Sequence, residues 1–345
     1  MGLREFTLQE FALQEFALIV MAGLCSAVLI VLFRPLFLRH ALARPNARSS
    51  HAAPTPQGGG VAVVLAVMLT LGAAGVFIGP ERTALVGALP LGAAVVLLAV
   101  VGAIDDMFPI AALPRLTVQA VAVIVVVTSM PAELRAVPIV PIALERTAEI
   151  VAGLWFVNLV NFMDGIDWMT VAETVPTTAS IFAFALLGAA PQPAGSVALA
   201  LCGAMLGFAP FNRPVAKLFL GDVGSLPVGL ILFWLLLQLA GSGHLAAALL
   251  LPLYYVADTT ITLLCRILRG ERITEAHRTH FYQLATVRGF SVMAVVELVF
   301  TVNLALGVLA ALSIWASSIA IHLAAMLAGG ALVAALLVAM WRGKR

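Results

Sequence analysis

The sequence has few charged residues and few cysteines for its length. Asp, Glu, Lys and Arg make up 10% of the 345 residues, hydrophobic residues make up 62%, and the net charge is +2. So small a net charge gives no reason to expect a nucleic-acid partner. The cysteines Cys25, Cys202 and Cys265 all lie in apolar stretches, so neither a disulfide framework nor a zinc site is indicated.

Two kinds of segment are also missing. The sequence contains no Gly-x-x-x-x-Gly-Lys-Ser/Thr motif, which disfavours an ATP-driven pump. Near the N-terminus, Glu5, Glu10 and Glu15 stand where a signal peptide has basic residues. We therefore expect Phe11–Phe33 to form an uncleaved first membrane span.

Long apolar runs dominate the chain instead. The mean hydropathy is +1.09, and apolar stretches of about 20 residues recur, each long enough to cross a hydrocarbon core of roughly 30 Å. Lipid offers the backbone no hydrogen-bond partner, so these runs should be helices; they are too long for barrel strands of about 10 residues. The predicted fold is an all-α polytopic membrane protein, a bundle of about 11 transmembrane helices forming a single integral-membrane domain, 1–345.

The predicted spans are 13–33, 60–78, 84–104, 116–132, 147–163, 171–190, 195–211, 226–241, 245–267, 291–313 and 317–341. Three of them, 116–132, 147–163 and 195–211, are near the lower length limit, so ten or twelve spans remain alternatives.

Basic residues lie mostly on one side of this arrangement. The segments on that side are 34–59, 105–115, 164–170, 212–225, 268–290 and the C-terminal tail. Together with Arg266 they hold 15 of the 19 basic residues, and the other side holds Arg4, Arg82, Arg135 and Arg146. The positive-inside rule makes the richer side cytoplasmic, with the N-terminus outside.

Five aspartates lie at or beside the ends of apolar runs on the cytoplasmic side: Asp105, Asp106, Asp164, Asp167 and Asp222. A carboxylate there is costly unless it meets water, a cation or a partner, so these are candidate functional groups. Adjacent Asp105 and Asp106 repel one another unless a cation lies nearby, and Arg115 follows in the same loop. Mg²⁺ suits such carboxylates, because it keeps waters and phosphate oxygens as its other ligands. A solvated helix end with Asp as N-cap is the alternative.

The segment around Asn161 holds a second polar group. Asn161, Asp164 and Asp167 fall within about one and a half helical turns, and Gly165 lets the backbone turn away. An amide beside carboxylates can orient a phosphate, ribose or base, or it can simply cap the next helix.

Glycines flank Asp222, the fifth aspartate. Gly221 and Gly224 let a backbone approach a phosphate closely. Phe219 is placed to stack on a nucleobase, although a phenylalanine beside a membrane more often serves as core.

Two more cytoplasmic loops combine basic, hydroxyl and histidine side chains. One runs from Arg48 past His51 and Thr55 into a glycine run, and suits either a phosphate cradle or an ordinary linker. The other contains His277, Arg278 and His280. No third soft ligand accompanies this histidine pair, so phosphate recognition is favoured over zinc. Carboxylates for Mg²⁺ and basic groups for phosphate are together what phosphoryl transfer at a membrane requires.

Four segments together resemble one family. They are Gly102-Ala-Ile-Asp-Asp106, Asn161-Phe-Met-Asp-Gly-Ile-Asp167, Phe219-Leu-Gly-Asp-Val-Gly-Ser225 and Glu275-Ala-His-Arg-Thr-His-Phe-Tyr-Gln283. In order and spacing they are similar to the cytoplasmic motifs of the polyprenyl-phosphate N-acetylhexosamine-1-phosphate transferases, glycosyltransferase family 4. The loop after Arg48 resembles the WecA- and WbpL-like bacterial branch, which initiates O-antigen and related polysaccharides, more than the MraY-like branch.

The resemblance implies a Mg²⁺-dependent enzyme of the bacterial inner membrane, with Mn²⁺ as an alternative metal and a cytoplasmic active site. Its substrates would be undecaprenyl phosphate and a UDP-N-acetylhexosamine, and its products undecaprenyl-diphospho-sugar and UMP. Asp222 is implied as the metal ligand, and Asp105 and Asp106 as catalytic residues beside the lipid phosphate. The residues implied to bind substrates are Asn161, Asp164, Asp167, Phe219, His277, Arg278, His280, Arg115, Arg48, His51 and Thr55. A phosphate monoester has a second pKa near 6, so we expect direct attack by the lipid phosphate rather than an aspartyl-phosphate intermediate.

Four residues depart from this pattern or add to it. Gln57 stands where the branch commonly has a basic residue, and Trp168 stands where a glycine is usual, either narrowing the pocket or anchoring at the membrane interface. Asp258 and Glu297 lie inside predicted spans, and we expect both to face the bundle interior.

Acids inside spans leave open a rival class, the cation-coupled secondary transporters, although no internal repeat of the kind common in transporters is evident. A lipid-binding scaffold is a third class, and within the enzymes the runner-up is a phospho-N-acetylmuramoyl-pentapeptide transferase. The identity of the sugar and the oligomeric state, including a homodimer, stay open.

Overall fold

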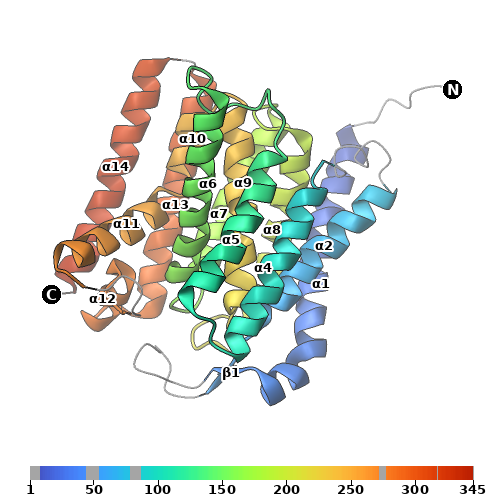
Figure 1. Ribbon diagram of the computed structural model, residues 1–345, viewed down its shortest axis with the longest axis vertical. Coiled ribbons are helices and arrows are strands. Elements are labelled where there is room, and N and C mark those ends of the chain that lie inside the picture. The colour runs from blue at the N-terminus through green and yellow to red at the C-terminus, as the bar shows by residue number, and fades with distance from the viewer. Residues whose placement is uncertain (1–7, 44–53, 78–86, 272–276, 317, 345) are drawn as a thin grey trace.

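The computed structural model describes residues 8–43, 54–77, 87–271, 277–316 and 318–344 (Figure 1). Its helices are α1 (Leu8–His40), α2 (Gly59–Phe77), α4 (Leu89–Met107), α5 (Ala112–Thr128), α6 (Ile142–Met163), α7 (Met169–Leu186), α8 (Gln192–Phe208), the 3-10 helix η1 (Ala209–Phe211), α9 (Asp222–Gly241), α10 (Leu245–Leu250), α11 (Leu253–Leu268), α12 (Phe281–Val287), α13 (Val292–Trp315) and α14 (Ile319–Arg342). Two short antiparallel strands, β1 (Leu42–Ala43) and β2 (Thr55–Pro56), complete the elements. Most of the long helices run along one common direction, from which α11 and α12 diverge (Figure 1).

Seven helices of the described residues are long and apolar enough to cross a membrane: α1, α4, α7, α8 together with η1, α9, α13 and α14. The apolar parts of α2 and α5 are shorter. The first two turns of α6 carry Glu145, Arg146 and Glu149, although that helix has 22 residues. The chain is therefore an all-α, multi-pass membrane protein, while the count of about eleven spans stays a prediction.

Every predicted span overlaps a helix, but two boundaries were wrong in ways that matter. The run 245–267 is not one helix: α10 ends at Leu250 and α11 begins at Leu253, on either side of Pro252, which has no amide hydrogen to continue a helix. The loop predicted at 105–115 is also shorter. Because α4 extends to Met107 and α5 begins at Ala112, the polar residues of this segment lie on helix ends.

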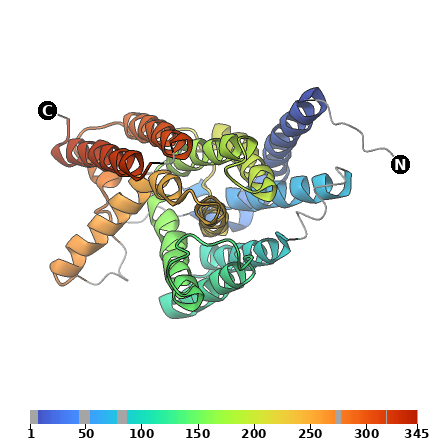
Figure 2. The same cartoon turned by 90° about the horizontal axis from the view of Figure 1, so that it is seen from above.

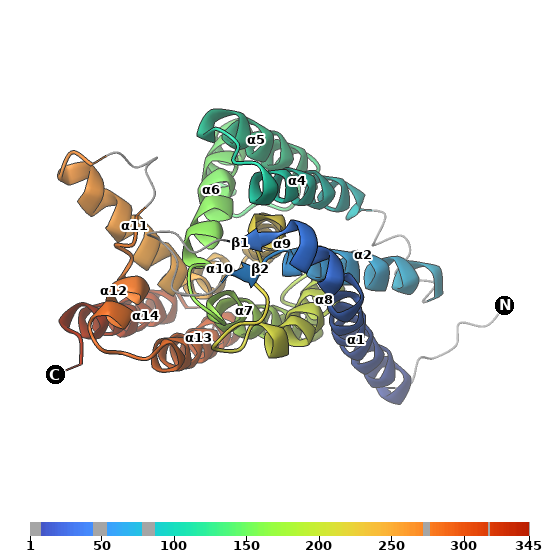
Figure 3. The same cartoon turned by 90° about the horizontal axis from the view of Figure 1, so that it is seen from below.

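Helix α9 occupies the centre of the bundle (Figures 2 and 3). Its membrane-length segment is entirely buried within the protein, and Asp222 at its start is its only ionisable residue. A helix that is apolar all round needs protein on every side, and α2, α4 and α6 pack against it. The first turn of α9 is therefore held from several directions.

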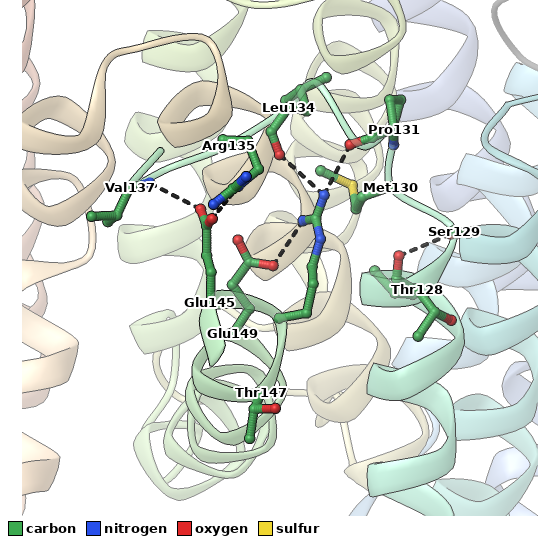
Figure 4. A network of polar contacts seen from close by, with 12 residues as sticks. Thr128, Ser129, Met130, Pro131, Leu134, Arg135, Val137, Glu145, Thr147 and Glu149 are labelled. Atoms are coloured by element: carbon green, nitrogen blue, oxygen red, sulfur yellow. Dashed lines mark hydrogen bonds and ion pairs between the residues drawn. The ribbon is translucent and has the colours of Figure 1, made fainter. Parts of the chain in front are cut away.

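Charged residues around the start of α6 pair with one another (Figure 4). The other end of this helix carries Asn161, which contacts Asp222, so these pairs lie at the opposite end of the bundle from Asp222. Arg135 donates to Glu145, which also accepts from the Val137 amide at 2.9 Å. Arg146 donates to Glu149 at 2.8 Å and to two carbonyls of the preceding loop. Because each acid has an arginine partner, α6 begins at Ile142, five residues before the predicted span.

Candidate active site

The predicted aspartates gather at one end of the bundle, the end viewed in Figure 3. Asp105 and Asp106 lie in the last turn of α4, and Asp222 is the first residue of α9. Asp164 directly follows α6, and Asp167 lies in the turn before α7. The cluster thus rests mainly on helix ends, which hold side chains more rigidly than loops.

Asp105, Arg115 and Asp222 form the most compact part of the cluster. One guanidinium nitrogen of Arg115, Nη1, lies 2.6 Å from Asp105 Oδ2 and 3.5 Å from Asp222 Oδ2. The second carboxylate oxygen of Asp105 accepts from the Ile110 amide at 2.6 Å. Two carboxylates from different helices thus share one cation, and the short turn between α4 and α5 fixes Asp105.

Asp106 points elsewhere, although it is the next residue in the chain. Its Oδ1 accepts from the Asp222 amide at 3.0 Å and its Oδ2 from the Val223 amide at 3.1 Å. These amides begin α9, where helical N–H groups lack partners within the helix. Asp106 is therefore an N-terminal cap supplied to α9 by α4, and it locates the backbone that carries Asp222.

Glycines make this capping contact geometrically feasible. A Cβ added to Gly102 would lie 2.3 Å from the Asp222 carbonyl oxygen, so only glycine lets α4 approach α9 this closely. Gly221 has a φ of +77°, a left-handed conformation, and its added Cβ would lie 2.5 Å from an Asp106 oxygen. The glycines of the two sequence motifs are thus part of one packing contact.

Asn161 completes the inner edge of the cluster. Its amide nitrogen lies 2.8 Å from Asp222 Oδ1 and 2.8 Å from the Ser225 hydroxyl oxygen. The structure therefore brings Asn161 and Asp222 together, and Ser225 was a missed contributor. Its position one turn after Asp222 was the only signal in the sequence.

Asp164 lies in a more enclosed place. Burial, the dominant effect, raises its pKa to about 8; the Thr170 hydroxyl, which donates to it, opposes the rise, while Asp222, Asp106 and Asp167 reinforce it. Its carboxyl group is therefore close enough to these three aspartates for their negative charges to disfavour its ionisation. Thr170 was not predicted.

Asp167 and Trp168 organise the turn beside the cluster. Asp167 is buried and accepts from the Ala216 amide at 2.9 Å. Trp168 has a φ of +62°; its amide donates to the Asn212 side chain at 2.8 Å and its indole N–H to the Ala209 carbonyl at 2.6 Å. Both residues tie the turn to the chain before α9. The two roles predicted for Trp168, narrowing the pocket or anchoring at the membrane interface, stay predictions.

Phe219 and Thr55 lie where the N-terminal segment meets α9. The Phe219 amide donates to the Pro56 carbonyl at 2.8 Å, and the Gly59 amide donates to the Phe219 carbonyl at 2.9 Å. Thr55 is buried in β2. The Gln57 side chain donates to the Asp106 carbonyl at 2.7 Å. The sequence showed that Gln57 replaces a basic residue of the family, but it did not predict this contact. The predicted residues Arg48 and His51 lie outside the described residues.

The predicted histidine loop reaches the same end of the bundle. His277 and His280 stack with ring centroids 4.9 Å apart, and His280 faces Phe162 of α6 at 6.3 Å. Arg278, between the two histidines, is partly buried. The Tyr282 hydroxyl donates to the Phe162 carbonyl at 2.9 Å and would lie 2.1 Å from a Cβ on Gly165. The histidines therefore lie beside the segment that carries Asn161 and Asp164.

The two acids predicted inside spans differ in placement. Asp258 is fully buried, as expected. Glu297 is exposed on α13, so the prediction that it faces the interior was wrong. It stands in the second turn of that helix, from which a flexible carboxylate can reach the water at the helix end.

The donor chemistry of the cluster fits Mg²⁺. Within the described ranges no three His, Cys, Asp or Glu side chains form a group able to hold a metal ion. Mg²⁺ needs no such cage, because it binds through one or two carboxylates and fills its remaining positions with waters and phosphate oxygens. Asp105 and Asp222 offer hard oxygens to one shared positive charge, that of Arg115. The metal itself stays a prediction.

Comparison with known proteins finds one matching family model and several relatives. A family model described as "Glycosyl transferase family 4" matches residues 88–240, which include Asp105, Asp106, Arg115, Asn161 and Asp222. A probable undecaprenyl-phosphate N-acetylglucosaminyl 1-phosphate transferase of Bacillus subtilis is 26% identical over 318 residues, 87% of each chain.

Two further relatives match over shorter lengths. A decaprenyl-phosphate N-acetylglucosaminephosphotransferase of Mycobacterium leprae is 32% identical over 214 residues, 56% of this chain and 52% of that protein. A phospho-N-acetylmuramoyl-pentapeptide-transferase of Limosilactobacillus fermentum is 35% identical over 109 residues, 32% of this chain and 33% of that protein. Residues 88–240 of the chain thus match glycosyl transferase family 4, and the chain is similar over most of its length to a probable polyprenyl-phosphate phosphosugar transferase.

Proposed function

We propose that this protein transfers an N-acetylhexosamine-1-phosphate from a UDP-sugar to undecaprenyl phosphate and so initiates an O-antigen or related surface polysaccharide. An oxygen of the lipid phosphate forms a bond to the β-phosphorus of the UDP-sugar. The bond between that phosphorus and the bridging oxygen breaks, and its electron pair leaves with UMP. The observation that carries the proposal is the sharing of Arg115 by Asp105 and Asp222 at the helix ends.

Arg115 and Asp105 are the proposed site of the acceptor phosphate. An arginine held by a carboxylate is preorganised to bind phosphate through charge-assisted hydrogen bonds. Asp105 is half-buried, with one oxygen on Arg115 and the other on a backbone amide, so it orients the arginine and takes any remaining proton from the acceptor. A dianionic phosphate needs no strong base, so attack is direct.

Asp106 has a different proposed role, because its oxygens accept from amides of α9, whereas those of Asp105 contact Arg115 and the Ile110 amide. It positions Asp222, the proposed Mg²⁺ ligand, and does not touch the substrates. When bound, Mg²⁺ supplies positive charge that stabilises the diphosphate in the transition state. Asp105 is thus proposed as the catalytic residue of the pair.

The UDP-sugar is proposed to lie between α6, α9 and the histidine loop. Asn161 and Asp164 then face the nucleotide, Phe219 the uracil, and His277, Arg278 and His280 the diphosphate and sugar. Support comes from the stacking of His280 near Phe162, one residue from Asn161. Asp167 supports this site through the Ala216 backbone.

The lipid tail has an apolar surface available. A groove of about 510 Å³ runs along α6 from Glu145 to Leu159, two residues before Asn161, and its other wall includes Val256 of α11. Its lining is almost wholly apolar, as an isoprenoid chain requires. The proposed location is the bacterial inner membrane, with this end of the bundle in the cytoplasm.

Purified protein with undecaprenyl phosphate, Mg²⁺ and a panel of labelled UDP-sugars tests the proposal. We expect sugar label in an organic-soluble product, with one UMP released per transfer. Asp222→Asn should lower the rate by at least about 10³-fold, because a charge aimed at the diphosphate is lost. Glu133→Gln makes the same chemical change on an exposed loop at the opposite end and should leave the rate unchanged.

Label that remains water-soluble would contradict the transferase, and a phosphorylated aspartate trapped during turnover would contradict direct attack. The panel includes UDP-N-acetylmuramoyl-pentapeptide, because the runner-up reaction is that of the Limosilactobacillus relative. If only this donor supports transfer, the proposed UDP-N-acetylhexosamine substrate is wrong, whereas the proposed type of reaction is retained.

A further inference from the structure

Asp258 is a carboxylate that the proposed reaction does not use. It lies in α11, is completely inaccessible to solvent, and contacts five residues, three of them outside its own helix. Those contacts are the Phe281 amide at 3.1 Å, the Tyr282 amide at 3.2 Å, His280 Nδ1 at 3.2 Å, the Tyr254 hydroxyl at 3.2 Å and the Thr262 hydroxyl at 3.3 Å. Burying a carboxylate costs free energy unless hydrogen bonds compensate for the lost water, so these contacts require a structural explanation.

Three of these contacts are to the start of α12. Phe281 and Tyr282 are the first two residues of that helix, whose opening amides have no partners within it. The residue before them, His280, places no side chain on those amides. A helix of seven residues has little stability of its own, so a carboxylate from α11 is a principal determinant of where α12 begins.

The third contact orients a histidine. Because Nδ1 of His280 faces Asp258, Nε2 is the ring nitrogen left to meet a substrate. The ring lies flat against His277 at 4.9 Å and Tyr282 at 5.8 Å. Tyr282 in turn donates to the Phe162 carbonyl, at the end of α6. Asp258 thereby connects α11 with the segment that carries Asn161 and Asp164.

We infer that Asp258 is a positioning residue, which holds α12 and His280 so that His280, stacked on His277, presents its Nε2 to the diphosphate of the donor. The chemical purpose of this arrangement rests on the proposed function. The positioning itself does not, since it follows from the contacts to the Phe281 and Tyr282 amides. A cation-transport role for Asp258 is not needed to explain its burial.

Substitutions of Asp258 and of its two partners on α11 distinguish the positioning of α12 and His280 from a general contribution to stability. Asp258→Asn keeps the shape but turns one acceptor into a donor facing backbone N–H groups. We expect it to lower kcat by about 10- to 100-fold, the usual effect of losing a residue that orients a ligand-binding histidine, with KM for the acceptor changed less than about threefold. Tyr254→Phe and Thr262→Val remove the other two contacts and should change kcat less than about threefold.

A double-mutant cycle tests whether Asp258 acts through His280. If it does, Asp258→Asn combined with His280→Gln should be no slower than His280→Gln alone. Losses that multiply would overturn the inference, as would an equal loss of kcat in Tyr254→Phe. If Asp258→Asn does not accumulate as folded protein, Asp258→Glu, which keeps the charge one methylene further out, is used in the same cycle.

Hydrogen exchange provides a readout that is independent of the reaction. In Asp258→Asn, amides within 277–287 should exchange about fivefold faster than in the wild type, because the start of α12 loses its cap, and in Tyr254→Phe they should not. Unchanged exchange overturns the inference even if transfer is observed. Absence of transfer in the wild type with faster exchange in Asp258→Asn would overturn only the proposed function.

Discussion

Asp105 and Asp106 are adjacent in sequence yet serve different partners. On the last turn of α4 their side chains diverge, so Asp105 meets Arg115 while Asp106 meets the amides of α9. A sequence motif of two acids therefore contains one group suited to binding substrate and one suited to holding a helix. Both acids are connected to Asp222: Asp105 through the shared Arg115, and Asp106 through the Asp222 amide.

Asp164 provides a pH prediction at the scale of one residue. Burial raises its pKa to about 8 in the folded protein, so the folded state favours the protonated acid. That preference is fully stabilising below the ordinary carboxyl pKa, near 3.9, and is lost as pH rises through about 8. Asp164→Asn removes this dependence. Without divalent metal, we expect its Tm to exceed that of the wild type most at pH 8.5 and to match it at pH 4.

The measurement is thermal unfolding in detergent with chelator across that pH range. Asp167→Asn is the comparison, because its carboxylate accepts a backbone hydrogen bond in the same turn. A difference between wild type and Asp164→Asn that stays constant from pH 4 to 8.5 would refute the assignment.

At the scale of elements, the site depends on how closely α4 approaches the start of α9. Gly102 lies one turn before Asp106, and its lack of a side chain allows the carboxylate to reach two amides of α9. The α9 turn is also approached by α2, where Gly60 meets Gly224 with no room for a Cβ. Close helix packing through glycine is common in membrane proteins, and here it sets the position of the proposed metal ligand.

Gly102→Ala tests this packing. The new Cβ would lie 2.3 Å from the Asp222 carbonyl oxygen, so the backbone must move and the Asp106 cap must loosen. We expect a loss of stability of about 1–3 kcal/mol, typical of overpacking, and a transfer rate lower by at least about tenfold. Gly72→Ala and Gly330→Ala are matched controls, because nothing lies within 4 Å of their added Cβ atoms. Equal Tm and rate for all three variants would show that the close approach does not matter.

At the scale of the whole molecule, the two ends of the bundle differ in chemistry. One end carries the aspartates, Arg115 and the histidine loop, and the other carries arginine–glutamate pairs around the start of α6 (Figure 4). Between them, α9 is buried on all sides and an apolar groove follows α6. The molecule thus has one end with the polar groups that the proposed reaction requires, and an apolar groove between the two ends.

The predicted orientation can be tested by cysteine labelling. After Cys25, Cys202 and Cys265 are replaced by serine, single cysteines are introduced as Lys217→Cys, at the aspartate end, or Glu133→Cys, at the opposite end; both native residues are exposed. The positive-inside rule predicts that an impermeant maleimide labels Lys217→Cys only in inside-out vesicles and Glu133→Cys only in right-side-out vesicles. The reverse pattern would refute the orientation.

Composition and motif spacing predicted the class, the helical character and the resemblance to one family, because apolar runs of membrane length and spaced motifs are local properties of the chain. The sequence also predicted which residues meet: Asp105, Arg115, Asn161 and Asp222 were all expected at one site, and they do lie together. Their separate geometric roles could not be read from spacing. Only the tertiary structure shows that Asp106 caps α9, that Asp167 accepts a hydrogen bond from a backbone amide, and that Asp258 caps the start of α12. It also shows that Glu297 is exposed. For Asp106, Asp167 and Asp258 the physical reason is that each carboxylate accepts from backbone amides of a segment distant in the chain, which spacing along the sequence does not reveal.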